Sequence, residues 1–385
     1  MRRALTAAAA SLLAGCAFIT PDRIHYRVDA APAATSRTPD SPDLVGVALS
    51  GGGSRAAVFA AAALEALFEQ GVLQQATHIS SVSGGGFAAS YYLVKRPADA
   101  EGFAAFRTAM RLDFFAAMEA RQLRSPGRFS SPTRRLSSLQ DALDRAFLDG
   151  AAFADLPSSP IFIINAARYD DARRFVFSPG ALADEPLDFE PYTDERLRAA
   201  SFSLPGCARP TPADFPLSLA VAISAAFPVL LGPATIEAHA ECDGGETLYW
   251  HLGDGGILEN TGVEALVEIA ARARRSVTPP RRVLIVSIDA GRETDSKTLF
   301  GDRNLRLWTR YPGRVVEIAA TRAEAWRAAA QRSFLAAGEA SADIVVLRYT
   351  DAQLTEWPAS CGRRAGDPAA IAGHIAAIPT SLRIS

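Results

Sequence analysis

A serine flanked by small residues is the first candidate for chemistry in this sequence. Ser83 follows a short candidate strand, His78–Val82, and precedes Gly84 and Gly85. A nucleophilic serine on a sharp strand-to-helix turn needs small neighbours, because the backbone doubles back tightly there. The helix that follows would direct its N-terminal dipole at developing negative charge. Ser83 is therefore a candidate nucleophile, although a Gly-rich serine turn alone is more often structural.

A second glycine-rich turn, Gly51-Gly52-Gly53-Ser54-Arg55, follows the apolar run Leu44–Ser50. Consecutive glycines leave backbone N–H groups unobstructed, which suits an oxyanion hole, and Arg55 would add positive charge. A dinucleotide-binding turn is the competing interpretation, but it requires an acidic residue about 20 positions on, where Ser81–Ser83 stand. A phosphate-binding P-loop is excluded because no Gly-Lys-Ser/Thr follows. The segment therefore favours an oxyanion hole.

A carboxylate that could act as the base comes much later in the chain. Asp254 ends the apolar run Leu248–Gly253, so it would project from the carboxyl end of a buried strand, where sites of α/β proteins gather. A second Asp-Gly-Gly at Asp243 has polar neighbours and indicates a surface turn. The alternative is a Ser-Asp-His triad of the α/β-hydrolase type with His374. His251 is a weaker candidate, because strand alternation turns it away from Asp254.

These pieces together resemble patatin-like phospholipases. The shared features are G-G-G-x-R after the first strand, the serine turn about thirty residues later, and the distant Asp-Gly-Gly. The segment Ile223–Pro228 resembles the family's A-S-x-A-x-P, and Ile378–Leu382 resembles its C-terminal end, so the resemblance spans residues 44–385. Three positions depart from the family pattern: Ser81 and Ala56 where glycine is frequent, and Gly262 where proline is usual.

The resemblance implies a lipid acyl hydrolase that acts through a Ser83–Asp254 dyad, with Gly51, Gly52, Gly53, Ser54 and Arg55 around the oxyanion. It implies a lipid substrate, contact with a membrane surface, and neither a cofactor nor a metal. A solvated carboxylate is too weak a base for this chemistry, so we expect a pocket that desolvates Asp254. The non-enzymatic alternative is a lipoprotein that keeps the fold as a binding or assembly module.

Apolar segments that alternate with helical patterns predict the fold class. The expected strands are Leu44–Ser50, His78–Val82, Ile161–Ala166, Leu248–Gly253, Val283–Ile288 and Ile344–Leu347. The expected helices are Ser54–Glu69, the segment after Ser83, Leu217–Ala226, Val263–Arg274 and Arg314–Ala337. Buried strands between helices indicate an α/β domain over residues 44–385, a three-layer α/β/α sandwich with a mainly parallel central sheet.

The N-terminus has the features of an exported lipoprotein. Arg2 and Arg3 precede an apolar stretch too short to span a bilayer, and Leu13-Ala14-Gly15-Cys16 resembles a bacterial lipobox. We expect residues 1–15 to be a signal peptide, Cys16 to carry lipid, and residues 16–43 to form a tether of about 90 Å at most. The resemblance implies the cell envelope, on the periplasmic side of the outer membrane. The alternatives are an ordinary cleaved signal peptide and a strap, including Ile24–Val28, packed on the domain.

The charge balance and the cysteine spacing bear on which partners the protein could bind. The 40 basic and 42 acidic residues nearly cancel, so no global field attracts nucleic acid. The four cysteines form no pair at metal-binding spacing, so a structural metal is not expected. The sequence does not indicate the oligomeric state. A Pro/Gly/Ser-rich stretch is expected to be a loop that either meets anionic lipid headgroups or is merely solvated. It carries Arg121, Arg124, Arg128, Arg134 and Arg135.

Overall fold

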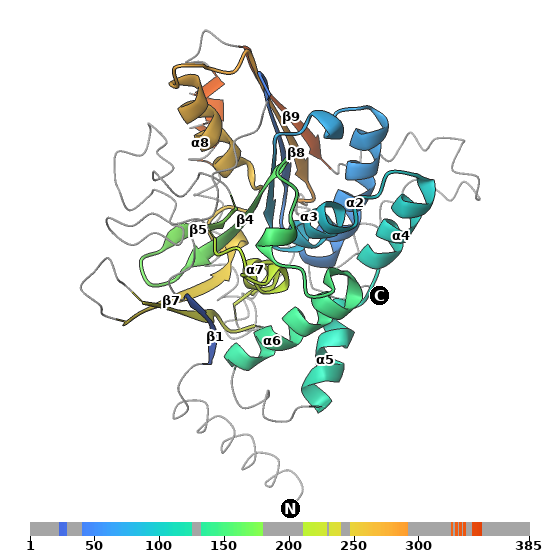
Figure 1. Cartoon of the computed structure of the whole chain (residues 1–385), viewed down its shortest axis with the longest axis vertical. Helices are drawn as coiled ribbons and strands as arrows, with labels where there is room; N and C mark the ends of the chain where they lie inside the picture. The colour runs from blue at the N-terminus through green and yellow to red at the C-terminus, as the bar shows by residue number, and fades with distance from the viewer. Residues whose placement is uncertain are drawn as a thin grey trace, which may run out of the picture.

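A nine-stranded mixed sheet forms the centre of the protein in this computed structural model (Figure 1). The structure describes residues 23–28, 41–124, 132–179, 211–228, 231–239, 247–291, 325, 328–329, 331–332, 334–335 and 341–348. The strands are β1 (Ile24–Val28), β2 (Leu44–Leu49), β3 (His78–Val82), β4 (Ile161–Arg168), β5 (Arg173–Phe177), β6 (Ala234–His239), β7 (Thr247–Asp254), β8 (Arg282–Asp289) and β9 (Ser341–Arg348). Their order is β1-β6-β7-β4-β3-β2-β8-β9, and β5 also pairs with β4.

The parallel strands lie at the heart of this sheet. Strands β4, β3, β2, β8 and β9 run parallel to their neighbours, whereas β5 and β7 pair antiparallel with β4. Every residue of β2 and β3 is buried, as expected for parallel strands covered on both faces. The carboxyl ends of β2, β3 and β4 therefore meet at one edge of the sheet, beside the end of β7.

Helices cover both faces of the sheet. Their bounds are α2 (Gly53–Glu69), α3 (Gly84–Lys95), α4 (Ala100–Met110), α5 (Phe114–Arg124), α6 (Pro132–Leu143), α7 (Leu217–Ser224) and α8 (Val263–Arg274). Buried residues of α2 to α7 share one core with Val47 and Leu49 of β2, and those of α8 share a second core with Leu44 and Ala48. The predicted three-layer α/β/α arrangement is thus confirmed (Figure 1).

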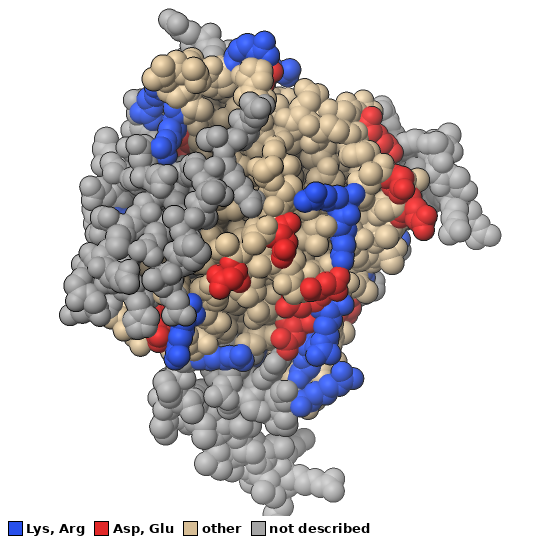
Figure 2. All heavy atoms as spheres, viewed as in Figure 1, with Lys and Arg blue, Asp and Glu red and all other residues tan. Residues whose placement is uncertain are grey.

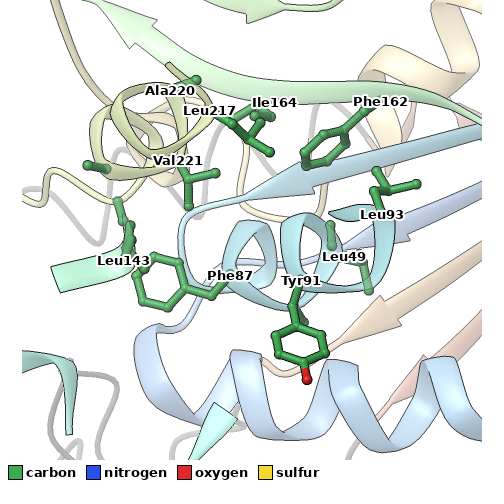
Figure 3. Close-up of a cluster of buried hydrophobic side chains, with 14 of the residues drawn as sticks. Leu49, Phe87, Tyr91, Leu93, Leu143, Phe162, Ile164, Leu217, Ala220 and Val221 are labelled. Atoms are coloured by element: carbon green, nitrogen blue, oxygen red, sulfur yellow. The ribbon is translucent and has the colours of Figure 1, made fainter. Parts of the chain in front are cut away.

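Helix α3 packs against the sheet beside α2 and α7. Figure 3 shows Phe87 and Tyr91 of α3 in one apolar cluster with Leu49, Ile164 of β4 and Val221 of α7. Phe87, Ile164 and Val221 have no solvent exposure. Burying such side chains stabilises the fold by about 1.5–3 kcal/mol each. The cluster fixes the N-terminus of α3, where Ser83 lies.

The expected elements correspond closely to those observed. The six predicted strands are present as β2, β3, β4, β7, β8 and β9, and the four predicted helices up to Arg274 are α2, α3, α7 and α8. The predicted helix Arg314–Ala337 lies mostly outside the described residues. The predicted arginine-rich loop was wrong at both ends, because α5 runs to Arg124 and α6 begins at Pro132. Helix α5 forms because it buries Phe114, Met118 and Gln122 on one face.

Strand β1 agrees with the alternative of a strap that packs on the domain over Ile24–Val28. It pairs in parallel with β6, and its Tyr26 ring lies 4.5 Å from the Phe215 ring, centroid to centroid. The Tyr26 hydroxyl also donates to Asp214 Oδ1 at 2.8 Å. Residues 24–28 are therefore part of the sheet, and only Ala17–Arg23 separate them from Cys16. Within the described part of the chain, none of the helices has the length and apolarity needed to cross a membrane.

Candidate active site

Ser83 lies at the sharp turn between β3 and α3. Its φ of 49° and ψ of −124° are rarely adopted by a residue with a side chain, and such strain costs about 1–3 kcal/mol. The turn is possible because its neighbours are glycines. A Cβ on Gly84 would overlap the Gly53 carbonyl, and a Cβ on Gly85 would lie 2.6 Å from the Ser50 carbonyl oxygen. The two glycine-rich turns are thus packed against each other.

The structure brings Ser83 and Asp254 into direct contact. The Ser83 hydroxyl donates to Asp254 Oδ2 at 3.2 Å, and the other carboxylate oxygen accepts the Gly256 N–H at 2.7 Å. The Asp254 backbone N–H is held by the Ala226 carbonyl at 3.3 Å. Both side chains are buried, with exposed fractions of 8% for Ser83 and 4% for Asp254. Among the residues that the structure describes, no imidazole lies between these two side chains, which are in direct contact.

Burial makes Asp254 a stronger base than an ordinary carboxylate. Removal from water raises the pKa of Asp254 from 3.8 to about 7, although the hydrogen bonds from Gly256 and Ser83 oppose the rise. A general base works best when its pKa is near the working pH. The expected desolvation of Asp254 is therefore present, and the raised pKa lets its carboxylate accept a proton near neutral pH.

The backbone N–H groups of the glycine loop Gly51–Gly53 differ in whether they are already hydrogen-bonded within the protein. The Gly51 N–H donates to the Asn260 carbonyl at 2.8 Å, so this amide holds the loop in place and is not available to an oxyanion. Gly52 and Gly53 have φ values of 132° and 60°, which favour glycine. Among the residues that the structure describes, neither Gly52 N–H nor Gly53 N–H has an acceptor. These two amides, at the start of α2, are the available donors.

The next two residues of that loop are buried in the first turn of α2. Ser54 has no exposed surface, and Arg55 is 9% exposed. The Arg55 Nε donates to the Ala290 carbonyl at 3.0 Å, after β8. Arg55 thus ties the glycine loop to the neighbouring strand, a structural role that the prediction of added positive charge did not include.

Asn260 joins the glycine loop to the Asp254 turn. Its carbonyl binds Gly51, and its side-chain oxygen lies so close to Gly51 and Gly256 that a Cβ on either would collide with it. Two residues later, Gly262 departs from the proline of the family pattern. Its φ of 75° is not accessible to proline, and its N–H donates to Glu259 Oε2 at 2.7 Å. The departure therefore reflects a locally different turn, capped by Glu259, before α8.

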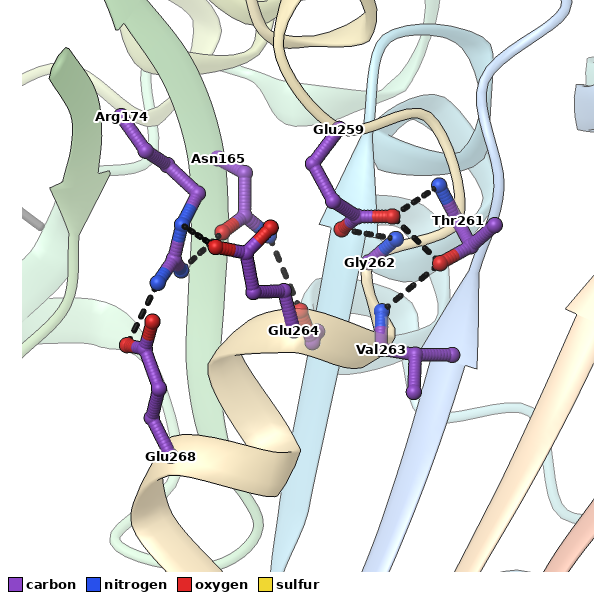
Figure 4. A network of polar contacts seen from close by, with 9 residues as sticks. Asn165, Arg174, Glu259, Thr261, Gly262, Val263, Glu264 and Glu268 are labelled. Carbon is purple, nitrogen blue, oxygen red and sulfur yellow. Dashed lines mark hydrogen bonds and ion pairs between the residues drawn. The ribbon is translucent and has the colours of Figure 1, made fainter. Parts of the chain in front are cut away.

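A buried polar network lies behind the site (Figure 4). The Asn165 side chain of β4 donates to Ser80 Oγ at 2.9 Å and to the Ser81 carbonyl at 3.0 Å. Arg174 of β5 donates to Asn165 Oδ1 at 3.1 Å and pairs with Glu268 of α8 at 2.5 Å. Burial raises the pKa of Glu268, and the Arg174 charge opposes this rise. The network connects β3, the strand that leads into Ser83, to α8.

Two exposed aromatic residues belong to segments that contact Asp254 or its neighbour Gly253. Tyr169, 40% exposed, packs over Gly253, where a Cβ would lie 2.7 Å from its Cζ. Burial and the nearby Asp254 raise the pKa of Tyr169 to about 12. Phe227, 57% exposed, directly follows the Ala226 that binds the Asp254 amide. The exposed ring of Tyr169 thus lies against the residue before Asp254, and an aromatic surface there suits a substrate with a hydrocarbon part.

The other residues that the sequence singled out either make contacts away from Asp254 or lie outside the described residues. The His251 imidazole is paired with Asp170, with Nδ1 2.7 Å from Oδ1, and it makes no bond to Asp254. His374, Asp243, the four cysteines and the Ile378–Leu382 motif lie outside the described residues. Across the described ranges, no group of three metal-ligating side chains is found. Charged side chains of both signs are intermixed on the face shown in Figure 2.

Sequence reasoning missed the residues that support the pair. Ser224 belongs to the segment Ile223–Pro228 that resembles the family pattern, and its hydroxyl accepts the Ser83 N–H at 2.9 Å. Asn165 and Asn260 were not singled out. The available signals were Ser224 in the A-S-x-A-x-P segment and Asn260 six residues after Asp254. Asn165 had no comparable signal, because its partners come from β3 and β5.

A family model described as patatin-like phospholipase matches residues 47–267, more than half of the 385 residues. No curated protein matches the chain. Human GIVD cytosolic phospholipase A2 is 14% identical, with a TM-score of 0.41, over 65% of this chain and 43% of that one. VipD from Legionella pneumophila is 15% identical, with a TM-score of 0.32, over 73% of this chain and 56% of that one. ExoU from Pseudomonas aeruginosa was solved in complex with SpcU. It is 17% identical, with a TM-score of 0.26, over 55% of this chain and 47% of that one. The chain thus spans about half the length of these structures.

Proposed function

The chain belongs to the patatin-like phospholipase family, and on this premise we propose that it hydrolyses carboxylic esters of lipids with Ser83 as nucleophile and Asp254 as general base. The observation that carries the proposal is the direct hydrogen bond between the Ser83 hydroxyl and the buried Asp254 carboxylate. Two glycine amides of the adjoining loop supply donors for an oxyanion, and the exposed ring of Tyr169, which packs over Gly253, suits an acyl chain.

The reaction follows from these positions. Ser83 Oγ attacks the ester carbonyl while Asp254 takes the hydroxyl proton, and the amides of Gly52 and Gly53 stabilise the oxyanion. The tetrahedral intermediate collapses as Asp254 returns the proton to the departing alcohol, which leaves an acyl group on Ser83. Water then gives its proton to Asp254 and attacks the acyl-enzyme. The second collapse returns the proton to Ser83 and releases the fatty acid.

The pH dependence of ester hydrolysis tests this proposal. With a neutral short-chain ester, kcat/KM should fall about tenfold for each pH unit below about 7, because protonated Asp254 cannot accept the Ser83 proton. Ser83→Ala should show no turnover above background at any pH, which identifies the enzyme as the source. A wild-type profile that stays flat down to pH 4 would contradict the role of Asp254. Equal turnover by wild type and Ser83→Ala would favour the non-catalytic module.

The Ser-Asp-His alternative makes a different prediction for the histidines. In a triad the imidazole would stand between Ser83 and Asp254, where the structure has a direct bond instead. His251→Ala and His374→Ala should therefore keep wild-type kcat within about threefold. A loss of about 10³-fold in His374→Ala would support the triad, since removing a triad member has effects of this size or larger.

Membrane attachment through a lipidated Cys16 is the second part of the proposal. The seven residues Ala17–Arg23 reach at most about 25 Å, well short of the expected tether. By the pairing register, Ile24 lies opposite Thr235, which lies opposite His251, three residues before Asp254. Two strand spacings and three residues give a separation of about 14 Å between Ile24 and Asp254. An anchor at Cys16 would thus hold the active-site edge close to the bilayer.

Lipid labelling in a bacterial host tests the anchor. Wild-type protein should incorporate labelled palmitate and sediment with membranes, and Cys16→Ser should do neither, because the thiol is the acceptor. Cys361→Ser is the matched control and should label like wild type. Absence of label in wild type would leave an ordinary signal peptide as the explanation of the N-terminus.

A further inference from the structure

The hydrogen-bond ladder between β3 and β4 is interrupted at Ser83. The ladder begins with Ile161 N–H donating to the Thr77 carbonyl, and the register then advances residue by residue to Val82 opposite Asn165. In a parallel pair with this pattern, the next bond would run from Ser83 N–H to the Asn165 carbonyl. The Ser224 hydroxyl stands between these two groups instead. It accepts Ser83 N–H at 2.9 Å and donates to the Asn165 carbonyl at 2.6 Å.

The Ser224 hydroxyl has two effects at the turn between β3 and α3. It separates the strands where Ser83 must leave β3 for its strained conformation. It also satisfies two buried backbone groups that would otherwise be costly. Ser224 itself has no solvent exposure, so water cannot take over this role without displacing packed side chains. The bridge therefore determines where the Ser83 backbone lies relative to β4.

The same segment also holds the other half of the pair. Two residues after Ser224, the Ala226 carbonyl accepts the Asp254 N–H at 3.3 Å. The Asn165 carbonyl that Ser224 binds also lies against Gly255, where a Cβ would collide with it. The end of α7 thus contacts the backbone of both reactive residues, through the Ser224 hydroxyl on one side and the Ala226 carbonyl on the other.

We propose that Ser224 is a positioning residue, whose hydroxyl bridge between Ser83 N–H and the Asn165 carbonyl sets the geometry of the Ser83–Asp254 pair. The inference rests on the proposed hydrolase function and deepens it. Ser224 touches no reacting atom, so its effect should appear in the rate of attack and not in substrate binding. A displacement of about 1 Å at a reacting group lowers rates about 10²-fold.

The test compares Ser224→Ala, Ser224→Thr and a control, Ser90→Ala, with a soluble ester. Ser90 is also a fully buried serine bonded to a carbonyl, that of Phe87, but within α3. Ser224→Ala should lower kcat about 10²-fold and slow fluorophosphonate inactivation equally, with KM within about twofold of wild type. Ser224→Thr keeps the hydroxyl and should retain kcat within about tenfold, and Ser90→Ala should match wild type in kcat.

The outcomes separate this inference from the proposed function. Wild-type kcat in a folded Ser224→Ala would overturn the positioning role while leaving the dyad intact. No turnover or labelling in wild type would instead remove the hydrolase proposal itself. If Ser224→Ala does not fold, Ser224→Cys replaces it, since a thiol fills similar space but is a weak hydrogen bonder. A folded Ser224→Cys with wild-type kcat would also overturn the role.

Discussion

Asp254→Asn should lower ester hydrolysis by about 10⁴-fold, because an amide cannot accept the Ser83 proton. The geometry should survive the change, since Oδ1 of the asparagine can still accept Gly256 N–H and its Nδ2 can donate to Ser83 Oγ. KM should change little. The control is Asp343→Asn on the exposed side of β9, which should leave kcat unaltered. Turnover within tenfold of wild type in Asp254→Asn would contradict the general-base assignment.

The same substitution should make the protein more stable. Because one pKa unit is worth 1.36 kcal/mol, raising the pKa of Asp254 from 3.8 to about 7 costs the folded state at most about 4 kcal/mol once the carboxylate is ionised. The folded state then binds a proton more tightly than the unfolded state, so wild-type stability falls as pH rises from about 4 to 7. Asp254→Asn avoids this loss.

Denaturant unfolding at two pH values measures the effect. The gain in the free energy of unfolding should be about 4 kcal/mol at most at pH 8 and about 2 kcal/mol at most at pH 5. Asp343→Asn should show no such difference. A gain that is equal at both pH values, or a loss of stability, would show that the Asp254 carboxylate carries no burial penalty. Such a penalty is the stability cost expected at a functional site.

Arg174→Met should destabilise the fold by about 3–5 kcal/mol, because it leaves the Glu268 carboxylate buried without its partner. The pKa of Glu268, already raised by burial, should rise further without the opposing charge of Arg174. A protonated glutamic acid is less costly to bury, so the loss of stability should be larger at pH 8 than at pH 5.

Two further variants show whether the charge pair is responsible. Arg174→Met with Glu268→Leu removes both charges and should recover most of the loss, since apolar replacement of a buried pair is often neutral. Arg173→Met, at the next and more exposed position, disrupts a surface pair with Asp171 and should cost less than about 1 kcal/mol. If the double variant is as unstable as Arg174→Met, packing of the arginine stem rather than charge accounts for the loss.

Ser83 and Asp254 could be singled out from the sequence because local constraints mark them, and the structure brings their side chains together. Ser83 needs glycines after it to leave the strand, and the Gly84 contact with Gly53 shows why those positions cannot carry side chains. Asp254 was identifiable because an apolar strand ends there. Six of the nine described strands were likewise predicted from short runs of the sequence, and of these β2 and β3 are buried throughout, whereas β1, β5 and β6 were not predicted.

The supporting contacts were not predictable because they join distant segments. Ser224 is 141 residues from the Ser83 amide that it binds, and Arg174 is 94 residues from Glu268. Strand β1 has a mixed sequence, IHYRV, and becomes a strand through its pairing with β6 and the contact of Tyr26 with Phe215. The bond from the Gly51 N–H to the Asn260 carbonyl is also a tertiary contact, so the sequence alone could not show that this amide is already engaged.

Labelling with a fluorophosphonate tests the central claim most directly, because the reagent reports an activated serine without assuming a substrate. The protein from Ala17 onward is incubated with the reagent, and the modified peptide is identified by mass spectrometry. We expect a single adduct on Ser83 in wild type, none in Ser83→Ala, and labelling slowed by about 10³-fold or more in Asp254→Asn. An unmodified wild type in the presence of lipid vesicles, or an adduct on a serine other than Ser83, would contradict the assignment of the active site.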